Sequence, residues 1–380
     1  MMGVLPMSLA YWPDKFTARN PLSAQHAFAS VSSCPHCEPP ISLLNAREKV
    51  RLQPLLSRKR RCEIIPTMGA TVAIILRAIL ILSVFVAPVL AQAPGSQQEQ
   101  PEFIKQGQQL MREGKLDAAL ALYRQTLQTS QDSLPANNAA GSVLDLMGQG
   151  EEARQYFGKA IQVADTPEHK AMAQRAMAMS YAFEGNCKKT IQHEQAVFNY
   201  YGSVKDFFRQ GETADEAARV CIDSGDLEAA YDWYKTGYET GLKEPDIKPA
   251  RKDLWEFRWE HAQARIAARR GNQAEAQKHV AAAKAILDKG TNPEQQPFFP
   301  YLEGYVAFYA GDYKSALEDF LKANQNDAFI QCMVGQTYEK LGNEEKALEY
   351  YRKASTAIAH NPAAAYAVPL AKKKLASLAS

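Results

Sequence analysis

Between residues 101 and 356, apolar side chains recur every three or four positions, which is the spacing of a helix with one buried face. The runs come in pairs, with a glycine between the two members and a polar or small residue directly after it. Seven pairs are marked in this way, by Gly114, Gly148, Gly185, Gly225, Gly271, Gly311 and Gly342. The pattern predicts an all-α chain built from about seven consecutive helical hairpins.

Each pair repeats a short phrase whose chemistry suits a tight hairpin. A glycine can end the first helix in a left-handed conformation at little cost. An Asp or Asn after it can cap the N–H groups that begin the second helix. A small Ala five residues after the glycine lets the helices approach, and a large apolar side chain four residues further on packs into the partner helix. The phrases read GKLDAALALY, GQGEEARQYF, GNCKKTIQHE, GDLEAAYDWY, GNQAEAQKHV, GDYKSALEDF and GNEEKALEYY.

These fixed positions resemble the tetratricopeptide repeat family, whose repeat has Gly in the first helix and Ala, an aromatic residue and Ala in the second. The clearest matches are Gly141, Leu144, Gly148, Ala153, Phe157 and Ala160; Gly304, Gly311, Ala316, Phe320 and Ala323; and Gly335, Tyr338, Gly342, Ala347, Tyr351 and Ala354. The resemblance implies a right-handed α-solenoid of about seven helix-turn-helix repeats over residues 101–356.

Two hairpins depart from the family pattern. In the third, Thr190 replaces the small Ala and Glu194 stands at the aromatic position, and in the fifth Val280 stands there. The long spacings between the marked glycines in this part of the chain predict extended helices or loops.

The last segment, residues 357–380, follows the seventh hairpin and contains Lys372–Lys374 near its C-terminal half. A solenoid needs a terminal element that covers its last repeat. We expect a C-terminal capping helix here, and the lysines suit the negative end of its dipole.

The family resemblance implies a concave groove lined by the first helices, and it places a basic and an aromatic stripe there. The basic stripe is Arg258, His261, Arg265 and Arg269, whose spacing also places them on one helical face. The aromatic stripe comprises Phe298, Tyr301, Tyr305, Phe308 and Tyr309. Together they favour a peptide partner that is acidic or has a free carboxylate. The alternative is a solvated arginine face and an ordinary hairpin core.

Cysteine positions allow one disulfide in the helical region. Cys187 and Cys221 are expected in neighbouring helices, where they either form a disulfide or are two small buried side chains. A Cα separation above about 7 Å would exclude the bond. Cys34 and Cys37 have the spacing of a redox motif but lack the strand and helix that such a motif needs.

The N-terminal quarter of the chain lacks the hairpin pattern. Residues 1–67 lack periodicity and are expected to be a disordered upstream extension ahead of a start at Met68. Residues 68–93 resemble a signal peptide, with an apolar stretch and a small-residue cleavage pattern. Residues 94–100 form a linker. The sequence predicts an exported, periplasmic or secreted protein; the alternative is a membrane anchor at 72–91 with the solenoid outside the cytoplasm.

The charge and motifs narrow the classes of function. After residue 93 there are 34 basic and 38 acidic residues, which argues against nucleic-acid binding. No catalytic, cofactor or metal-binding motif is found, so we expect no catalytic residues, no cofactor and no metal. The leading hypothesis is a non-enzymatic scaffold that binds a protein or peptide. The alternatives are a structural subunit of a cell-envelope assembly, and an enzyme, which would require a polar cluster in hairpins three to five that the sequence does not reveal.

Overall fold

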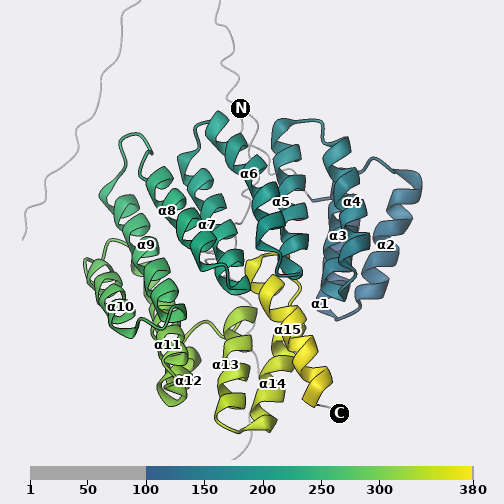
Figure 1. Cartoon of the computed structure of the whole chain (residues 1–380). Coiled ribbons are helices and arrows are strands. Elements are labelled where there is room, and N and C mark those ends of the chain that lie inside the picture. The colour runs from purple at the N-terminus through teal and green to yellow at the C-terminus, as the bar shows by residue number, and fades with distance from the viewer. Residues whose placement is uncertain (1–99, 379–380) are drawn as a thin grey trace, which may run out of the picture. The chain divides into compact units, whose positions relative to one another are not determined.

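The structure is a computed structural model that describes residues 100–378, and all seven predicted hairpins are present there (Figure 1). The described residues form α-helices and one 3-10 helix, so the all-α prediction is confirmed for this part of the chain. Consecutive helices pack against one another along the chain, which is the arrangement of a helical solenoid. The expectations for residues 1–67, 68–93 and 94–99 lie outside the described residues.

The hairpins follow the order of the sequence pattern. Their first helices are α1 (Glu102–Arg112), α3 (Leu134–Met147), α5 (Pro167–Phe183), α7 (Phe207–Ser224), α9 (Pro249–Arg269), α11 (Phe299–Tyr309) and α13 (Ala328–Lys340). Their second helices are α2 (Leu116–Thr129), α4 (Gly150–Val163), α6 (Cys187–Ser203), α8 (Leu227–Gly241), α10 (Gln273–Leu287), α12 (Tyr313–Lys322) and α14 (Glu344–Ser355). A 3-10 helix, η1 (Pro293–Phe298), precedes α11, and α15 (Pro362–Leu378) follows the last hairpin.

The turn inside each hairpin has the predicted chemistry. The seven marked glycines all adopt positive φ angles, between 67° and 94°. The residue after the glycine caps the second helix in hairpins three to seven, through Asn186, Asp226, Asn272, Asp312 and Asn343. Local sequence therefore sets where each first helix ends and each second helix begins.

A glycine in the first helix makes room for an aromatic ring from the second helix in four hairpins. A Cβ added to Gly141 would lie 2.6 Å from the ring of Phe157, and one added to Gly304 would lie 2.8 Å from the ring of Phe320. The same relation holds for the pairs Gly107–Tyr123 and Gly335–Tyr351. These contacts hold the two helices of hairpins one, two, six and seven close together.

The wider glycine spacings in the middle of the chain come from longer helices and, between α10 and α11, from η1, in line with the predicted extended helices or loops. Helices α7 and α9 contain 18 and 21 residues, compared with 14 in α3. In the third hairpin Thr190 is fully buried, and its hydroxyl donates to the carbonyl oxygen of Ala178 at 3.2 Å. Thr190 is therefore accommodated at the crossing because its hydroxyl finds a partner on the first helix.

Helix α15 packs on α13 and α14, as expected of a capping helix, and it also contacts α5 and α7 (Figure 1). Ala364, Ala365 and Val368 of α15 belong to the same hydrophobic cluster as residues of the first three hairpins. The C-terminal helix thus links the last hairpin directly to the third and fourth. Among the described helices, none combines the length and apolar character needed to cross a bilayer.

Candidate functional site

The predicted basic stripe lies on α9, and the aromatic stripe lies on α11 except for Phe298, which ends η1; the structure brings the two stripes into contact. The Arg265 guanidinium donates to the Tyr301 hydroxyl at 3.4 Å and to the Tyr234 hydroxyl at 2.7 Å. Arg269 donates to the Tyr309 hydroxyl at 3.2 Å. Tyr301 and Tyr305, and then Tyr305 and Tyr309, stack edge-on or tilted along α11. Guanidinium and phenol groups therefore form one continuous cluster, which we call the Arg–Tyr cluster.

Arg219 of α7 joins the Arg–Tyr cluster, although the sequence reasoning did not select it. Its guanidinium donates to the Tyr301 hydroxyl at 2.8 Å, pairs with Asp223 at 2.8 Å, and lies 3.9 Å from the centroid of the Phe329 ring. A sequence signal was available, because Arg219 stands six residues before Gly225 and Arg265 stands six residues before Gly271. Equivalent positions in successive hairpins fall on the same face of the solenoid.

Most of the Arg–Tyr cluster is buried. Arg265, its neighbour His261 and Tyr305 each keep 1% of their surface exposed, and Tyr301 is also buried. Arg269 and Tyr309 are half-buried and form the accessible end. Burial and the neighbouring Arg265 cation hold the pKa of His261 well below its usual range, so this imidazole is neutral at physiological pH. A ligand approaching from solvent would meet Arg269 and Tyr309 first.

Arg258, at the other end of the basic stripe, faces acidic groups rather than tyrosines. Its guanidinium donates to Glu212 at 3.1 Å and lies 4.0 Å from Asp215. Burial raises the pKa of Asp215 to about 7, against the opposing effect of the Arg258 cation. The predicted stripe is therefore divided between a tyrosine environment and a carboxylate environment.

Hairpins three and four bury a second group of charged side chains, which the sequence did not reveal. Arg175 of α5 forms a bidentate pair with Glu216 of α7, with Nε to Oε2 at 2.7 Å. Glu194 of α6 is fully buried, and its carboxyl oxygens have no hydrogen-bond partner among the described residues. Burial, and then the nearby Glu216 carboxylate, raise the pKa of Glu194 well above its usual range, which favours its neutral form. Sequence reasoning missed this group because 41 residues separate Arg175 from Glu216.

Helix α15 covers part of the face formed by the first helices. His360, just before α15, donates its Nε2–H to the buried Asp145 carboxylate at 2.8 Å and stacks on Phe183 with ring centroids 5.4 Å apart. Lys372 donates to the Leu146 carbonyl oxygen at 2.6 Å. These polar contacts, one just before α15 and one in its second half, join it to α3.

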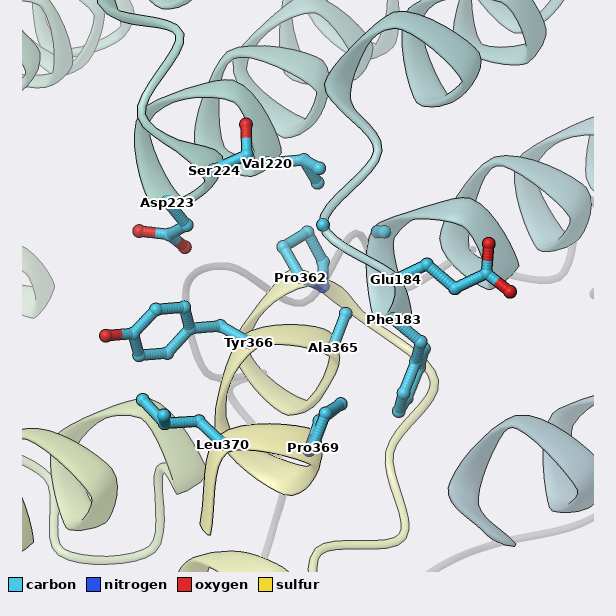
Figure 2. Close-up of a pocket in the computed structure, with 12 residues that line it drawn as sticks. Phe183, Glu184, Val220, Asp223, Ser224, Pro362, Ala365, Tyr366, Pro369 and Leu370 are labelled. Atoms are coloured by element: carbon cyan, nitrogen blue, oxygen red, sulfur yellow. The ribbon is translucent and has the colours of Figure 1, made fainter. Parts of the chain in front are cut away.

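A cleft of about 250 Å³ lies between α15 and the C-terminal ends of α5 and α7 (Figure 2). Phe183, Val220 and Asp223 face Pro362, Ala365, Tyr366, Pro369 and Leu370 across it. Pro369 has no N–H group, so the Ala365 carbonyl lacks its usual helical donor at this cleft. The walls are mainly apolar, and Asp223 is already paired with Arg219.

The Asp145 carboxylate also accepts a hydrogen bond from the Ser180 hydroxyl at 2.8 Å. Ser180, Asp145 and His360 are the residue types of a hydrolase triad, but the serine and the histidine both bind the carboxylate. A nucleophilic serine requires a hydrogen bond to the imidazole instead. This buried group therefore fixes the start of α15 and has no arrangement for nucleophilic catalysis.

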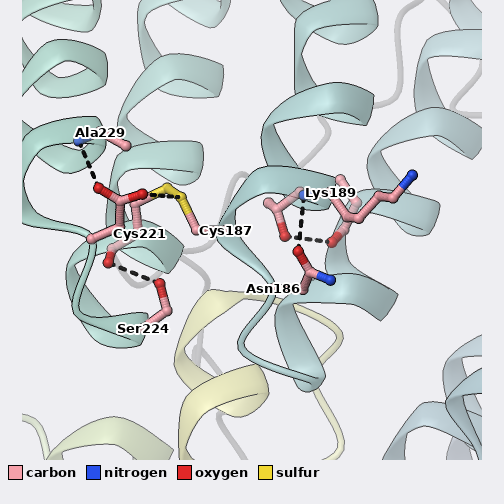
Figure 3. The surroundings of a disulfide bond; sticks show 9 residues. Asn186, Cys187, Lys189, Cys221, Ser224 and Ala229 are labelled. Atoms are coloured by element: carbon pink, nitrogen blue, oxygen red, sulfur yellow. Dashed lines mark hydrogen bonds between the residues drawn. A yellow bond between two sulfur atoms is a disulfide. The ribbon is translucent and has the colours of Figure 1, made fainter.

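Cys187 and Cys221 are joined by a disulfide, with Cα atoms 4.8 Å apart (Figure 3). The bond links the first turn of α6 to the last turn of α7, and so joins hairpins three and four. Cys332 is a buried free thiol. The Cys34 and Cys37 pair lies outside the described residues. Within residues 100–378, no three His, Cys, Asp or Glu side chains gather as metal ligands would.

Comparison with known proteins identifies one repeat by sequence. Residues 330–361 match the family model described as "Tetratricopeptide repeat", and they span most of α13, all of α14 and the segment after it. No curated protein matches the chain.

Several solved structures resemble the helical region. A tetratricopeptide repeat protein from Parabacteroides merdae has 14% identity and a TM-score of 0.43, with 73% of this chain and 98% of that chain covered. A Rap protein complexed with competence and sporulation factor has 14% identity and a TM-score of 0.43, with 73% and 75% covered. A putative kinesin light chain with tetratricopeptide-like repeats from Podospora anserina has 16% identity and a TM-score of 0.41, with 50% and 94% covered.

The seven hairpins share their turn glycines, their small crossing residues and their order of packing, and the last of them matches the family model. By sequence, the match to the tetratricopeptide repeat family model is therefore placed on residues 330–361, within a chain of seven stacked helical hairpins.

Proposed function

We propose that this protein is a non-enzymatic scaffold that binds a protein or peptide partner at the accessible end of the Arg–Tyr cluster. The observation that carries the proposal is the convergence of arginine and tyrosine side chains from α7, α9 and α11 on one face. Guanidinium groups form strong, directional hydrogen bonds with carboxylates, and tyrosine rings offer contact area at low entropic cost. The partner is therefore acidic at the contact point or presents a free carboxylate.

A charge reversal at Arg269 tests this proposal, because Arg269 is half-buried and reversal there leaves the interior of the cluster in place. Reversal at Arg265, with 1% exposure, would test folding instead. The matched control is Arg270→Glu, since Arg270 is exposed and bonds Glu228 on a different helix. Affinity capture from the native compartment, quantified by mass spectrometry, should lose the specific partner with Arg269→Glu and keep it with Arg270→Glu. Equal capture by both variants would reject a binding site at the accessible end of the Arg–Tyr cluster.

We further propose that the helical region lies outside the cytoplasm, either in an exported protein or attached to a membrane anchor at 72–91. Two features support it: the signal-like segment at 68–93 and the Cys187–Cys221 disulfide, which is stable in oxidising compartments. Mass spectrometry of the N-terminus of the captured protein would distinguish cleavage near Ala91 or Ala93 from an intact anchor.

A second candidate is a structural subunit of a cell-envelope assembly. Helix α15 covers part of the face formed by the first helices, and this favours the second candidate. A structural subunit would contact its neighbours through the second helices, so its first-helix face need not stay open. The Arg269→Glu variant separates the two functions, since a structural subunit would keep its neighbours.

A further inference from the structure

Helix α15 covers more of the molecule than a terminal cap requires. It packs on α13 and α14 of the last hairpin, and it also contacts α5 and α7, the first helices of hairpins three and four (Figure 1). His360 and Lys372 bind the Asp145 carboxylate and the Leu146 carbonyl oxygen, both on α3 of the second hairpin. A cap needs to cover only the last repeat, so the contacts with hairpins two to four exceed that role.

One side chain of α15 lies against the Arg–Tyr cluster. The Tyr366 ring is tilted on the Phe329 ring, with centroids 4.9 Å apart. The Phe329 ring in turn contacts Tyr301 and the Arg219 guanidinium. Across the cleft Tyr366 faces Asp223, which pairs with Arg219 (Figure 2). While α15 is docked, it therefore closes this side of the cluster to a partner.

Tyr366 also lies close to the accessible end of the cluster. Burial raises the pKa of Tyr366, and the neighbouring Cys332 thiol and Tyr309 hydroxyl raise it further. A separate cavity beside Arg219 and Tyr301 measures about 20 Å³, which is room for about one water molecule. That cavity cannot admit a side chain of a partner, so docked α15 limits access to these two residues.

The docked face of α15 consists of small side chains. Its buried residues are Ala363, Ala364, Ala365, Ala367, Val368 and Ala371. A methyl group buries little apolar area, so α15 gains less from docking than a helix with leucine or phenylalanine on this face would. Clefts of about 250 and 430 Å³ also border the helix. Helix α15 is therefore held more weakly than its length suggests.

Pro369 weakens the helix itself. It stands in the middle of α15, where it has no N–H group to donate to the Ala365 carbonyl and its ring crowds that carbonyl. Proline is the least favourable residue in a helix interior. The packed surface around α15 must therefore hold the helix together as well as in place, and both features move the balance toward release.

We propose that α15 is an autoinhibitory helix, which covers the Arg–Tyr cluster while it is docked on hairpins two to four and is displaced when a partner binds there. This inference rests on the function proposed above, because the cluster that α15 covers is the proposed binding site. Release opens the Phe329 side of the cluster in addition to Arg269 and Tyr309. The apparent affinity for a partner is then lower than the intrinsic affinity, in proportion to the fraction of chains with α15 released.

The test shifts this balance in both directions in the full chain. Val368→Asn places an amide in the hydrophobic cluster that Val368 joins, and this favours release. Its matched control is Ala376→Asn, at an exposed position of the same helix. Pro369→Ala restores the missing N–H group and favours docking.

The probe is a fluorescein-labelled hexaglutamate peptide with a free C-terminal carboxylate, and an amidated hexaglutamine peptide is its uncharged control. Fluorescence anisotropy measures the dissociation constant for each variant. Hydrogen exchange followed by mass spectrometry measures the release of α15 in the free chain, with the amides of α13 as the internal reference.

We expect the amides of α15 to exchange faster than those of α13 in the wild-type chain. Val368→Asn should speed this exchange and tighten hexaglutamate binding about tenfold, whereas Pro369→Ala should slow the exchange and weaken binding about tenfold. Ala376→Asn should bind as the wild type does.

Two results would overturn the autoinhibitory helix and leave the proposed function standing. One is exchange of the α15 amides as slow as that of the α13 amides. The other is a hexaglutamate affinity that Arg269→Glu abolishes but that does not follow the exchange rate of α15. Binding to none of the variants would reject the proposed function and this inference with it. Pro369→Ala keeps the test valid if Val368→Asn fails to fold.

Discussion

Hairpins one, two, six and seven differ from hairpins three to five in what fills the space between their helices. Seven residues before the turn glycine, the first group has glycine, and an aromatic ring from nine residues after the turn packs into that space. At the same two positions the central hairpins have Ala178 and Glu194, Ala218 and Tyr234, and Ala264 and Val280. The outer hairpins are therefore closed by a contact between a glycine and an aromatic ring, whereas the central hairpins have alanine in place of that glycine.

The central hairpins are instead tied to their neighbours. The Arg175–Glu216 pair and the Cys187–Cys221 disulfide join hairpins three and four, and the Arg258–Glu212 pair joins four and five. The comparison shows two ways to stabilise the same solenoid: packing within each repeat at its ends, and polar or covalent links between repeats in its middle. Links between repeats are costly to break, because they leave buried charges without partners.

The largest effect is expected from Glu216→Gln. The substitution leaves the Arg175 cation buried without its carboxylate, and the free energy of unfolding should fall by about 3–5 kcal/mol. The chemically identical change Glu194→Gln should cost much less, because burial already favours the neutral form of Glu194. Urea unfolding of both variants measures the difference.

The double variant Glu194→Gln with Glu216→Gln sharpens this prediction. It should lose more than the sum of the single losses, because Glu194 can then no longer ionise beside Arg175 in place of Glu216. Strict additivity would mean that the three groups are not coupled.

The second largest loss of stability should follow removal of the disulfide. Replacing Cys187 and Cys221 with serine opens a link that spans 34 residues, and about 2–4 kcal/mol of stability should be lost. Reduction of the wild-type chain with dithiothreitol should give a similar loss. The same reductant should not affect the double-serine variant, and a further loss there would point to a different cause.

Asp215→Asn should change the pH dependence of stability. Because the folded-state pKa of Asp215 is about 7, above its ordinary value of 3.8, this residue's contribution to stability is full below about pH 4 and is lost as pH rises to 7. Relative to the wild type, the free energy of unfolding of the variant should therefore rise across that pH range. The rise should be about 2 kcal/mol once the 17% exposure of the side chain is allowed for. Thermal melts at pH 5 and pH 8 measure this gain, and a pH-independent difference would mean that Asp215 titrates normally.

The smallest effects on stability should come from exchanging the glycine of an outer hairpin and the alanine of a central hairpin at the position seven residues before the turn glycine. Gly141→Ala introduces a Cβ 2.6 Å from the Phe157 ring and should cost about 1–2 kcal/mol despite the better helix propensity of alanine. The reverse change in the third hairpin, Ala178→Gly, should cost about 1 kcal/mol through helix propensity and lost packing. If Gly141→Ala were stabilising, the aromatic contact would not be what closes the outer hairpins.

The sequence by itself determined the local features of this protein. Glycine at Gly225 and Gly311, followed by the capping residues Asp226 and Asp312, fixes where helices end and begin, because these effects act within one turn. The seven hairpins and their order could therefore be predicted before any coordinates. The arginine and tyrosine stripes could also be placed on α9 and α11, because helical spacing decides which side chains share a face.

Only the tertiary structure decided which of these side chains are buried and what they meet. Arg265 is an interior residue because α8 and α11 bring Tyr234 and Tyr301 against it, and helical spacing does not give that burial. His360 and Asp145 are 215 residues apart, and their bond exists because α15 crosses back to the early hairpins. Contacts of this kind depend on how stacked repeats are placed in space, whereas local sequence signals act over only a few residues.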